Sequence, residues 1–448
     1  MVDKKRVVIR KKRAAHAGTG KFNFTREMIP VMSDGKQEAE FLTKYRKKAW
    51  KAYENAELPK TDEEAWRRTD LRKLETDALK VAVIDSEVSV PEELIKPVSD
   101  EKLGGQITLT PVGTEISLDP ELAEKGVVFT DLETASIEYP EILEMILGQI
   151  IKPDEDKFSA MTAAFSKSGV LLFIPKGVLV EKPLQSLLWA PGEGRANFSH
   201  LLIWLEEGAS AKYVHEYSSP TEIGQSLHSG IVEIHVSRAA NLHFIELQSW
   251  GNQVWNFTHE GAHLDNDATL EWVFGAMGSR LSKNFSKIDL IGQGATVRMA
   301  GFYFTDGVQH LDHDTQQNHM APNTTSDLIF KGALKDGSRS VWQGMIYVAP
   351  GAQKTDGYQS NPNLVLGKEA RADSIPGLEI MADDVRCTHG ATVGKIDPAE
   401  VFYLNSRGIP KDEAERLIVE GFFDPILQRI PFVRIRERMQ QVIVDKLN

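Results

Sequence analysis

The pattern of hydrophobic and polar positions changes near Gly169. From there to Asp383, short runs of alternating β-branched, aromatic and polar residues recur, and Gly, Asn, Asp and Ser separate them. Alternation with a period of two, bounded by turn residues, is typical of β-strands. Stretches with helical periodicity are nearly absent from this part of the chain. We therefore expect a mostly β core, whose clearest strands are His200–Leu205, Ile231–Val236, Leu242–Leu247 and Leu270–Phe274.

A weak internal repeat runs through this core. Four segments share a polar or glycine turn, a small residue and then an alternating run. The small residues are Ala209, Ala240, Ala268 and Ala295, at steps of 31, 28 and 27 residues. A repeat of this length predicts a solenoid or propeller, and a parallel β-helix fits better because a propeller blade needs about 40–45 residues. Recurrent Gly-Ala turns in an antiparallel β-domain are the alternative.

The N-terminal region has a different, mixed pattern. Lys36–Asn55 sets aromatic residues among charges at helical spacing and predicts a helix. Thr61 and Glu64 have the spacing of a capping box, and Pro140–Gly148 predicts a short helix opened by proline. Val81–Val90 has the composition of a strand.

The C-terminal end is predicted to be helical again. Asp412–Glu420 places acidic residues near the positive end of a helix dipole, and Gly421 is expected to end that helix. A second helix is expected over Pro425–Lys446, with an interruption near Pro431. Its apolar residues exceed what a short terminal helix buries by itself. We therefore expect it to dock onto the body of this chain or onto a partner.

These patterns divide the chain into four parts. Residues 1–20 are predicted to be a disordered basic tail, because no periodic apolar pattern follows Lys4–Arg13; an arm for an anionic surface or for nucleic acid is the alternative. Residues 21–165 form the N-terminal helical and mixed region. Residues 166–396 form the β-helix core, and residues 397–448 form the C-terminal helical domain.

The composition of the chain limits the classes of partner and the cellular compartment that we expect. The chain has 448 residues, of which 41% are hydrophobic, and a formal net charge of −12. Nucleic-acid binding is not expected, because it needs a basic footprint. No stretch approaches the ~20 apolar residues of a membrane span, and no signal-peptide pattern is visible. We expect a cytoplasmic protein without a membrane partner. The single cysteine, Cys387, rules out an intrachain disulfide and fits a reducing compartment.

Motifs of common enzymes are missing from the sequence. It contains no Walker-type phosphate loop, no nucleophile elbow and no H-E-x-x-H zinc motif. The glycines around Gly261 do not form a dinucleotide fingerprint. We therefore expect a protein that is not an enzyme and does not hydrolyse ATP itself.

The densest group of potential ligands is the run from His310 to His319. On a strand, His310, Asp312 and Asp314 share one face, while His313 and His319 lie on the other. The set therefore does not converge automatically on a metal ion. A polar strand and turn at a subunit interface, with hydrogen-bonded histidines, is the favoured interpretation, and a metal site is the alternative.

Cys387 and His389 form a second constellation. In an extended segment their side chains point to the same side, and a thiolate with an imidazole suits a soft metal or an iron–sulfur cluster. The neighbouring Arg386 is expected to favour the thiolate. A buried structural cysteine beside a hydrogen-bonded histidine is the alternative. A Cys–His hydrolytic dyad is disfavoured, because two positions on one strand leave little room for a substrate.

Two segments resemble a known family. The run His310–Ile409 is similar to the SufB/SufD family of the SUF iron–sulfur cluster assembly system, and Thr61–Leu71 (TDEEAWRRTDL) resembles the SufD branch. Pro362 departs from the family pattern, as does the basic N-terminus. The resemblance implies a right-handed parallel β-helix core flanked by N-terminal and C-terminal α-helical regions, in agreement with the repeat.

The resemblance also implies partners. It implies a SufB-like paralogue, contacted near the C-terminal end of the β-helix, and a SufC-like ABC ATPase gripped by the C-terminal helices. Cys387 and His389 correspond to positions at the interface where a nascent cluster forms. Such a cluster is transient and shared with the partner, and no cofactor is bound tightly by this chain alone. The expected partner-binding residues are Phe402, Tyr403, Arg407, Leu417, Phe422, Phe423 and Ile426.

The cysteine count favours the SufD branch. Clusters are held by about four ligands, mostly cysteine thiolates, so a chain with one cysteine must share the site. We therefore expect a non-catalytic scaffold subunit. One alternative is a homodimer that combines two Cys–His pairs. Another is a stand-alone β-helix enzyme that acts on a polysaccharide, since that fold hosts such activities.

Overall fold

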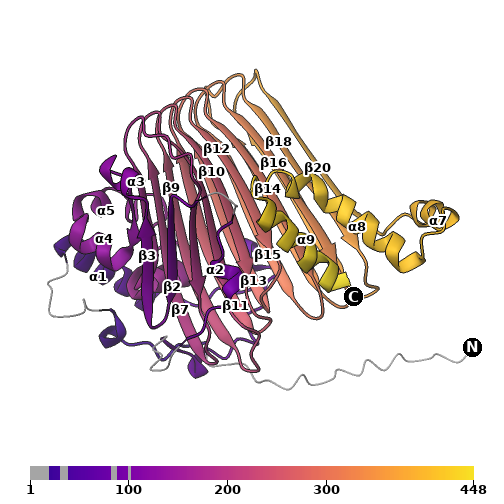
Figure 1. The fold of residues 1–448 in the computed structure, drawn as a ribbon, viewed down its shortest axis with the longest axis horizontal. Coiled ribbons are helices and arrows are strands. Elements are labelled where there is room, and N and C mark those ends of the chain that lie inside the picture. Colours follow the sequence, from indigo (N-terminus) through magenta and orange to yellow (C-terminus); the bar gives the residue numbers. More distant parts are fainter. Residues whose placement is uncertain (1–19, 31–38, 82–87, 99–101, 448) are drawn as a thin grey trace, which may run out of the picture.

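A long stack of β-strands dominates the computed structural model, which describes residues 20–30, 39–81, 88–98 and 102–447 (Figure 1). Helices lie at both ends of the stack. The basic run Lys4–Arg13 and most of the predicted strand Val81–Val90 fall outside the described residues. A two-residue strand, β1 (Lys80–Val81), pairs with β7 (Arg195–Leu205) of the stack.

The core is a solenoid in which successive strands alternate between two parallel sheets. Sheet A contains β5 (Ser168–Ile174), β7 (Arg195–Leu205), β9 (Ser226–Val236), β11 (Val254–Leu264), β13 (Leu281–Leu290), β15 (His310–His319), β17 (Arg339–Val348) and β19 (Arg371–Ile380). Sheet B contains β6 (Leu184–Trp189), β8 (Ser210–Ser218), β10 (Asn241–Ser249), β12 (Thr269–Ala276), β14 (Thr296–Thr305), β16 (Thr325–Leu334), β18 (Asp356–Val365) and β20 (Arg386–Gly394). About eight coils result, which confirms the predicted mostly β solenoid with flanking helices.

The alanine repeat marks one corner of the coils. Ala209, Ala240, Ala268 and Ala295 each stand immediately before a strand of sheet B, and those strands pair in register. All four side chains are buried. Asn241, Thr269 and Thr296 each donate their N–H to the alanine carbonyl of the coil before, at 2.8–2.9 Å. A small residue is needed there because the coils stack closely at the corner.

Alternate side chains of both sheets fill the interior. Leu242, Phe244 and Trp272 are fully buried there, and they belong to one continuous apolar cluster along the axis. Burying a side chain of this size stabilises the fold by about 1.5–3 kcal/mol. The sequence alternation therefore corresponds to an inward-facing and an outward-facing side of each strand.

The N-terminal region covers the beginning of the solenoid. Its elements are α1 (Glu40–Asn55), α2 (Glu92–Ile95), β2 (Gly105–Thr110), β3 (Gly113–Leu118), α3 (Pro120–Glu124), β4 (Val128–Asp131), α4 (Leu132–Glu138), α5 (Pro140–Ile146) and α6 (Lys157–Phe165), with short 3₁₀ turns at Arg26–Met28, Glu64–Trp66 and Thr76–Ala78. β2 and β4 extend sheets B and A. α6 packs on the outer face of sheet A, where Phe158 stacks on Phe257 with ring centroids 3.7 Å apart.

Two of the N-terminal helix predictions are confirmed, and one is wrong. α1 lies within Lys36–Asn55, and α5 lies within Pro140–Gly148. The capping box at Thr61 is absent, because the chain makes only a 3₁₀ turn at Glu64–Trp66, without a side-chain cap. There Glu63, not Glu64, accepts a backbone N–H, from Lys60 at 2.9 Å. Trp66 is buried in the cluster that α6 forms with the outer face of sheet A, so packing rather than a helix cap holds this segment.

The C-terminal helices are α7 (Pro398–Ser406), α8 (Lys411–Leu427) and α9 (Val433–Leu447). The predicted stop at Gly421 is wrong, since α8 continues through it and includes Pro425. A buried stripe of Val419, Phe423 and Ile426 packs on the outer face of sheet B. That packing outweighs the roughly 1 kcal/mol helix penalty of one glycine. The helix break lies between Leu427 and Val433, which confirms the predicted interruption near Pro431, although the second helix begins later than expected.

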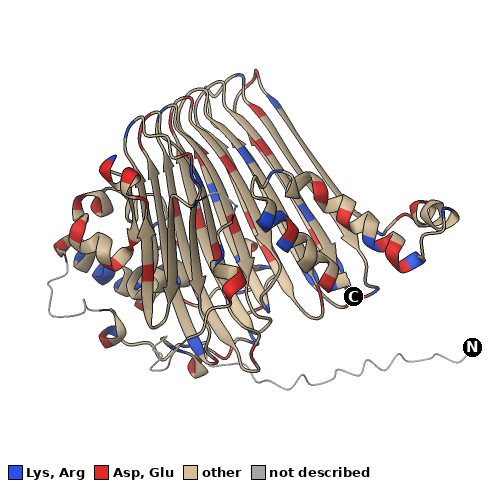
Figure 2. Ribbon diagram, in the orientation of Figure 1, with Lys and Arg blue, Asp and Glu red and all other residues tan. Residues whose placement is uncertain are grey.

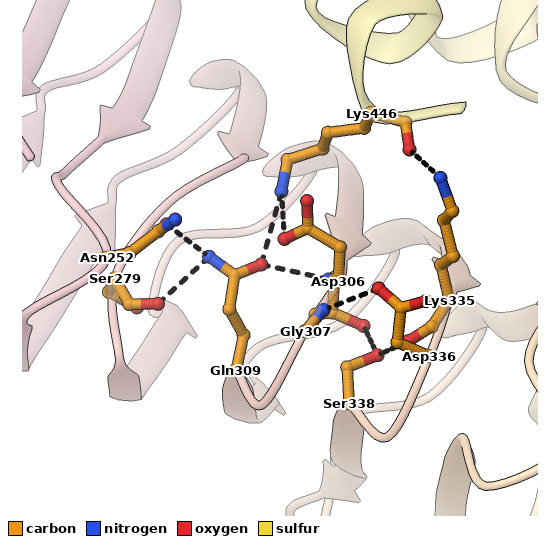
Figure 3. Close-up of polar contacts among 10 residues, drawn as sticks. Asn252, Ser279, Asp306, Gly307, Gln309, Lys335, Asp336, Ser338 and Lys446 are labelled. Atoms are coloured by element: carbon orange, nitrogen blue, oxygen red, sulfur yellow. Dashed lines mark hydrogen bonds and ion pairs between the residues drawn. The ribbon is translucent and has the colours of Figure 1, made fainter. Parts of the chain in front are cut away.

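The end of α9 is fastened to the turns of the solenoid (Figure 3). Lys446 Nζ donates to Asp306 Oδ1 at 2.7 Å and to Gln309 Oε1 at 3.1 Å. Lys335 Nζ in turn donates to the backbone oxygen of Lys446 at 3.0 Å. It also donates to the backbone oxygen of Leu447 at 3.0 Å. A cation at these carbonyl groups satisfies the C-terminal end of a helix. α9 is therefore held at its end as well as along its apolar face.

Charged residues are dense on the flanking helices, whereas long stretches of the strands carry neither sign (Figure 2). None of the helices in the described part of the chain combines the length and the apolar character that a membrane crossing needs.

Candidate functional site

The C-terminal end of the solenoid is open. β19 and β20 are the last strands of sheets A and B, and no strand among the described residues pairs with their outer edges. Every residue of β20 is at least partly exposed, in contrast to the buried alternate positions of β16 or β18. An edge of this kind presents unpaired N–H and C=O groups that another chain can use. Figure 1 shows α7 projecting past this end.

Cys387 and His389 lie on the inner face of β20. They pair in register with Gly357 and Gln359 of β18, and paired residues of parallel strands point to the same face. Gln359 fixes that direction, because its amide donates across the interior to the carbonyl of Gly377 at 2.9 Å. The thiol and the imidazole therefore face the interior of the last coil, which no further coil covers.

The surroundings of Cys387 favour a neutral thiol. The side chain packs against a small apolar cluster that includes Ile346 and Val348. Burial raises the pKa of the thiol above its ordinary value, an N–H hydrogen bond from Gly357 opposes this, and the carboxylate of Asp356 adds to it. The expected help from Arg386 is absent, since its guanidinium is exposed and lies 3.7 Å from Asp356. That expectation was wrong because the arginine occupies the outer face.

The ligand-rich strand β15 does not form a metal site. His313 points into the solenoid among Phe274, Tyr303 and Phe330, and burial lowers its pKa to about 4. His319 makes hydrogen bonds inside the solenoid to Thr324 at 2.8 Å and to a nearby serine. Throughout the described ranges, no group of three or more His, Cys, Asp or Glu residues is placed to hold a metal ion. The metal alternative is therefore wrong here.

The outer face of β15 carries an ion pair that the sequence did not reveal. Lys283 Nζ lies 2.9 Å from Asp312 Oδ1, and both side chains are fully buried. Thr69 donates to the other carboxylate oxygen of Asp312 and lies 3.3 Å from His310 Nε2. The cover over this strand is thus the chain's own N-terminal segment. Lys283 and Asp312 are far apart in sequence, and the pairing of β13 with β15 brings them side by side.

Comparison with known proteins identifies the family. Residues 188–422 match the SUF system FeS cluster assembly, SufBD core domain, and residues 32–186 match the SufBD protein N-terminal region. The chain belongs to the SufBD family. An iron-sulfur cluster assembly protein SufB from Bacillus subtilis is 31% identical over 427 residues, which cover 91% of this chain and 90% of the relative. SufBD family proteins from Staphylococcus saprophyticus and Staphylococcus haemolyticus are 30% identical with the same coverage. The family resemblance is therefore confirmed.

The residues predicted to bind a partner fall into two groups in this SufBD-family chain. Phe402 and Tyr403 on α7 are 73% and 57% exposed, and Leu417 on α8 is 38% exposed. The guanidinium of Arg407 lies 5.1 Å from the centre of the Tyr403 ring. These four residues lie on α7, on the turn after it and on the first half of α8, a region we call the arm. The apolar side chains of Phe402, Tyr403 and Leu417 are therefore left open by the packing of the chain itself.

The other group packs within the chain itself. Phe423 and Ile426 are completely buried against sheet B, so their assignment to a partner interface is corrected. Phe422 is partly buried, with the ammonium of Lys331 4.9 Å from its ring centre. Lys331 also donates to the Phe422 carbonyl at 2.7 Å. These residues hold α8 onto the solenoid. The apolar spacing of α8 predicted a buried face but not whether the same chain buries it.

Proposed function

We propose that this chain is a non-catalytic scaffold subunit of SufD type in the SUF iron–sulfur cluster assembly system. It pairs through the open end of its solenoid with a SufB-like paralogue, and its arm binds a SufC-like ABC ATPase. The observation that carries the proposal is the placement of Cys387 and His389 on the inner face of the uncovered last coil. A partner that docks on this end can complete the ligand set.

Ligand arithmetic supports the shared site. A cluster takes about four ligands, and Cys387 is the only cysteine of the chain. One thiolate and one imidazole supply half of such a set. A SufB-like chain is expected to bring more cysteines, which favours the SufD branch for this one. The growing cluster is cargo here, handed on after assembly.

The protonation state of the Cys387 thiol is consistent with a ligand that binds metal only when the cluster is assembled. Burial raises the pKa of Cys387, so the isolated chain holds a neutral thiol at neutral pH. Metal coordination requires the thiolate and therefore releases a proton. The apolar cluster around the sulfur excludes water on one side, and the partner covers the other. The chain thus contributes two ligands and shields the cluster from water. ATP hydrolysis by the ATPase bound to the arm drives the movement of the subunits.

A homodimer is the second candidate, since two copies joined at their open ends would supply two cysteines and two histidines. The same exposed strand β20 supports it. We do not propose a polysaccharide-degrading enzyme, because the family is one of iron–sulfur assembly proteins.

Two experiments test the proposal. Affinity purification from cells that also express the paralogue and the ATPase should recover all three chains; recovery of this chain only as a dimer favours the second candidate. The double variant Cys387→Ser with His389→Ala should abolish cluster assembly in cells while the complex still forms. Thr388→Ala with Thr392→Ala, on the outer face of the same strand, is the matched control. Full assembly activity in the Cys–His variant contradicts the site assignment.

A further inference from the structure

The arm projects from the solenoid and is held only at its base (Figure 1). The hydrogen bonds and ion pairs that the structure describes for residues 398–418 all end within the arm or at its own two junctions. α7 packs on α8, and Val401 and Ala414 are the residues of this range that are buried. Val419 is the first residue of α8 that enters the apolar cluster on sheet B.

The rest of the C-terminal region is fastened to the solenoid by polar contacts as well as by packing. In α8, the carbonyl of Phe422 accepts a hydrogen bond from Lys331 Nζ at 2.7 Å. α9 is held by an ion pair between Arg438 and Glu216 and, at its end, by the contacts of Lys446 (Figure 3). The second half of α8 and all of α9 therefore form one body with sheet B.

α8 has its weakest turn at the boundary between these two parts. Pro425 lies inside the helix and has no N–H, so the carbonyl of Gly421, four residues earlier, lacks its helix hydrogen bond. Glycine is also the poorest helix former after proline. Both residues are exposed. A Cβ at Gly421 would meet nothing within 4 Å and the φ of Gly421 is not positive, so neither space nor backbone conformation requires the glycine.

The other connection of the arm to the solenoid is irregular as well. Lys395–Asp397 join β20 to α7 and belong to neither a strand nor a helix. Ile396 packs against the same apolar cluster on sheet B that Val419 enters. The two junctions of the arm therefore meet the solenoid at one apolar cluster, and the arm can turn about both together.

We propose that the arm pivots as a unit about Gly421 and the linker Lys395–Asp397, while the second half of α8 and all of α9 stay docked on sheet B. Val419 is the apolar contact that the base of the arm releases when it pivots. The pivot belongs to this chain alone. Its use, which is to let a bound ATPase move relative to the open end, rests on the proposed function.

The first test measures the position of the arm in the isolated full-length chain. Spin labels at Asn405→Cys on α7 and Gln441→Cys on α9, both exposed, are placed in a Cys387→Ser background. Double electron–electron resonance then gives the distribution of distances between the arm and the docked helix. Combining Gly421→Ala with Pro425→Ala should narrow this distribution roughly twofold, because alanine restores the missing N–H and favours the helix. An unchanged width in the folded variant overturns the pivot.

Two single variants keep this test decisive. Val419→Ala removes the apolar contact at the base and should broaden the distribution, whereas an unchanged width argues against the release of Val419. Gly421→Ala should slow hydrogen exchange of the amides of Glu420–Asp424 about 5-fold, and equal exchange rates overturn the weak turn. Gly390→Ala on β20 is the control, since its Cβ also meets nothing within 4 Å. Circular dichroism establishes that each variant is folded.

The second test uses the complex with the paralogue and the ATPase. The variant Gly421→Ala with Pro425→Ala keeps Phe402 and Tyr403, so it should bind the ATPase with unchanged affinity and yet hold several-fold less cluster. Full cluster content in that variant overturns the use of the pivot. If the ATPase does not bind the wild-type chain, the proposed function fails, whereas the pivot is decided by the distances in the isolated chain.

Discussion

Phe423 and Phe402 provide a matched pair for separating the chain's own packing from partner binding. Phe423 is fully buried, with its ring centre 5.2 Å from that of Phe422 and 6.3 Å from that of Phe302. Phe402 is 73% exposed on α7. Phe423→Ala removes apolar burial and leaves a cavity, which costs about 3–5 kcal/mol. Phe402→Ala removes little that the isolated chain uses, so its free energy of unfolding should change by no more than about 0.5 kcal/mol.

The assay has two readouts for each variant. Urea unfolding with hydrogen exchange should show lost protection of α8 and α9 in Phe423→Ala, whereas Phe402→Ala should match the wild type. Calorimetric titration with the ATPase should show the reverse, since truncation of an exposed aromatic anchor typically costs about 2 kcal/mol, or roughly 30-fold in affinity. Normal stability of Phe423→Ala would refute the docked position of α8. Normal ATPase binding by Phe402→Ala would refute the arm as the binding surface.

Further predictions concern the solenoid itself. Asp312→Ala removes the nearer of the two carboxylates beside the buried Lys283 and leaves Asp314 at 3.9 Å, so it should cost up to about 3–5 kcal/mol of unfolding free energy; adding Lys283→Met should recover most of the loss, and a loss below about 1 kcal/mol would contradict the buried pair. Burial raises the pKa of Asp314 to about 6, so this group should lower stability as pH rises from about 4 through 6. Asp314→Asn should flatten the dependence of the unfolding free energy on pH. At pH 7 the variant should be more stable by at most roughly 3 kcal/mol, and by less than that because the Asp314 side chain is 28% exposed. Urea unfolding measured across this pH range checks the prediction, and an unchanged pH profile in the variant would contradict it. Ala268→Leu should overpack the buried corner and lower the thermal midpoint through a cost of about 1–3 kcal/mol; an unchanged thermal midpoint would contradict the close stacking of the coils there.

Short-range patterns carried much of the fold. Alternation identified the strands because each one buries every second side chain, as Leu242 and Phe244 do. The recurring alanines identified the solenoid, since Ala240 and Ala268 occupy the same tight corner in successive coils. The strand pattern is local, because burial alternates between adjacent residues. The solenoid pattern is readable because the buried corner recurs at a nearly constant interval in the sequence.

Long-range packing decided what the sequence could not. Gly421 is a reasonable helix stop locally, but Phe423 docks on sheet B and holds α8 together beyond it. Spacing predicted that Cys387 and His389 lie on one face of the strand. It did not predict whether that face is the inner or the outer one, or which residues lie next to them. The thiol was expected to be activated by Arg386, whereas apolar neighbours from β17 keep it neutral. The contact between Thr69 and Asp312 likewise joins residues far apart in sequence.

Cluster content of the isolated complex tests the central claim most directly. The chain is co-expressed with a cysteine-richer paralogue and the ATPase, the complex is purified without oxygen, and iron and acid-labile sulfide are measured per complex. The account predicts a cluster in the wild-type complex, and an intact complex without a cluster when Cys387→Ser is combined with His389→Ala. Equal cluster content in the wild type and the double variant would contradict the claim that the open end of this solenoid supplies half of a shared site.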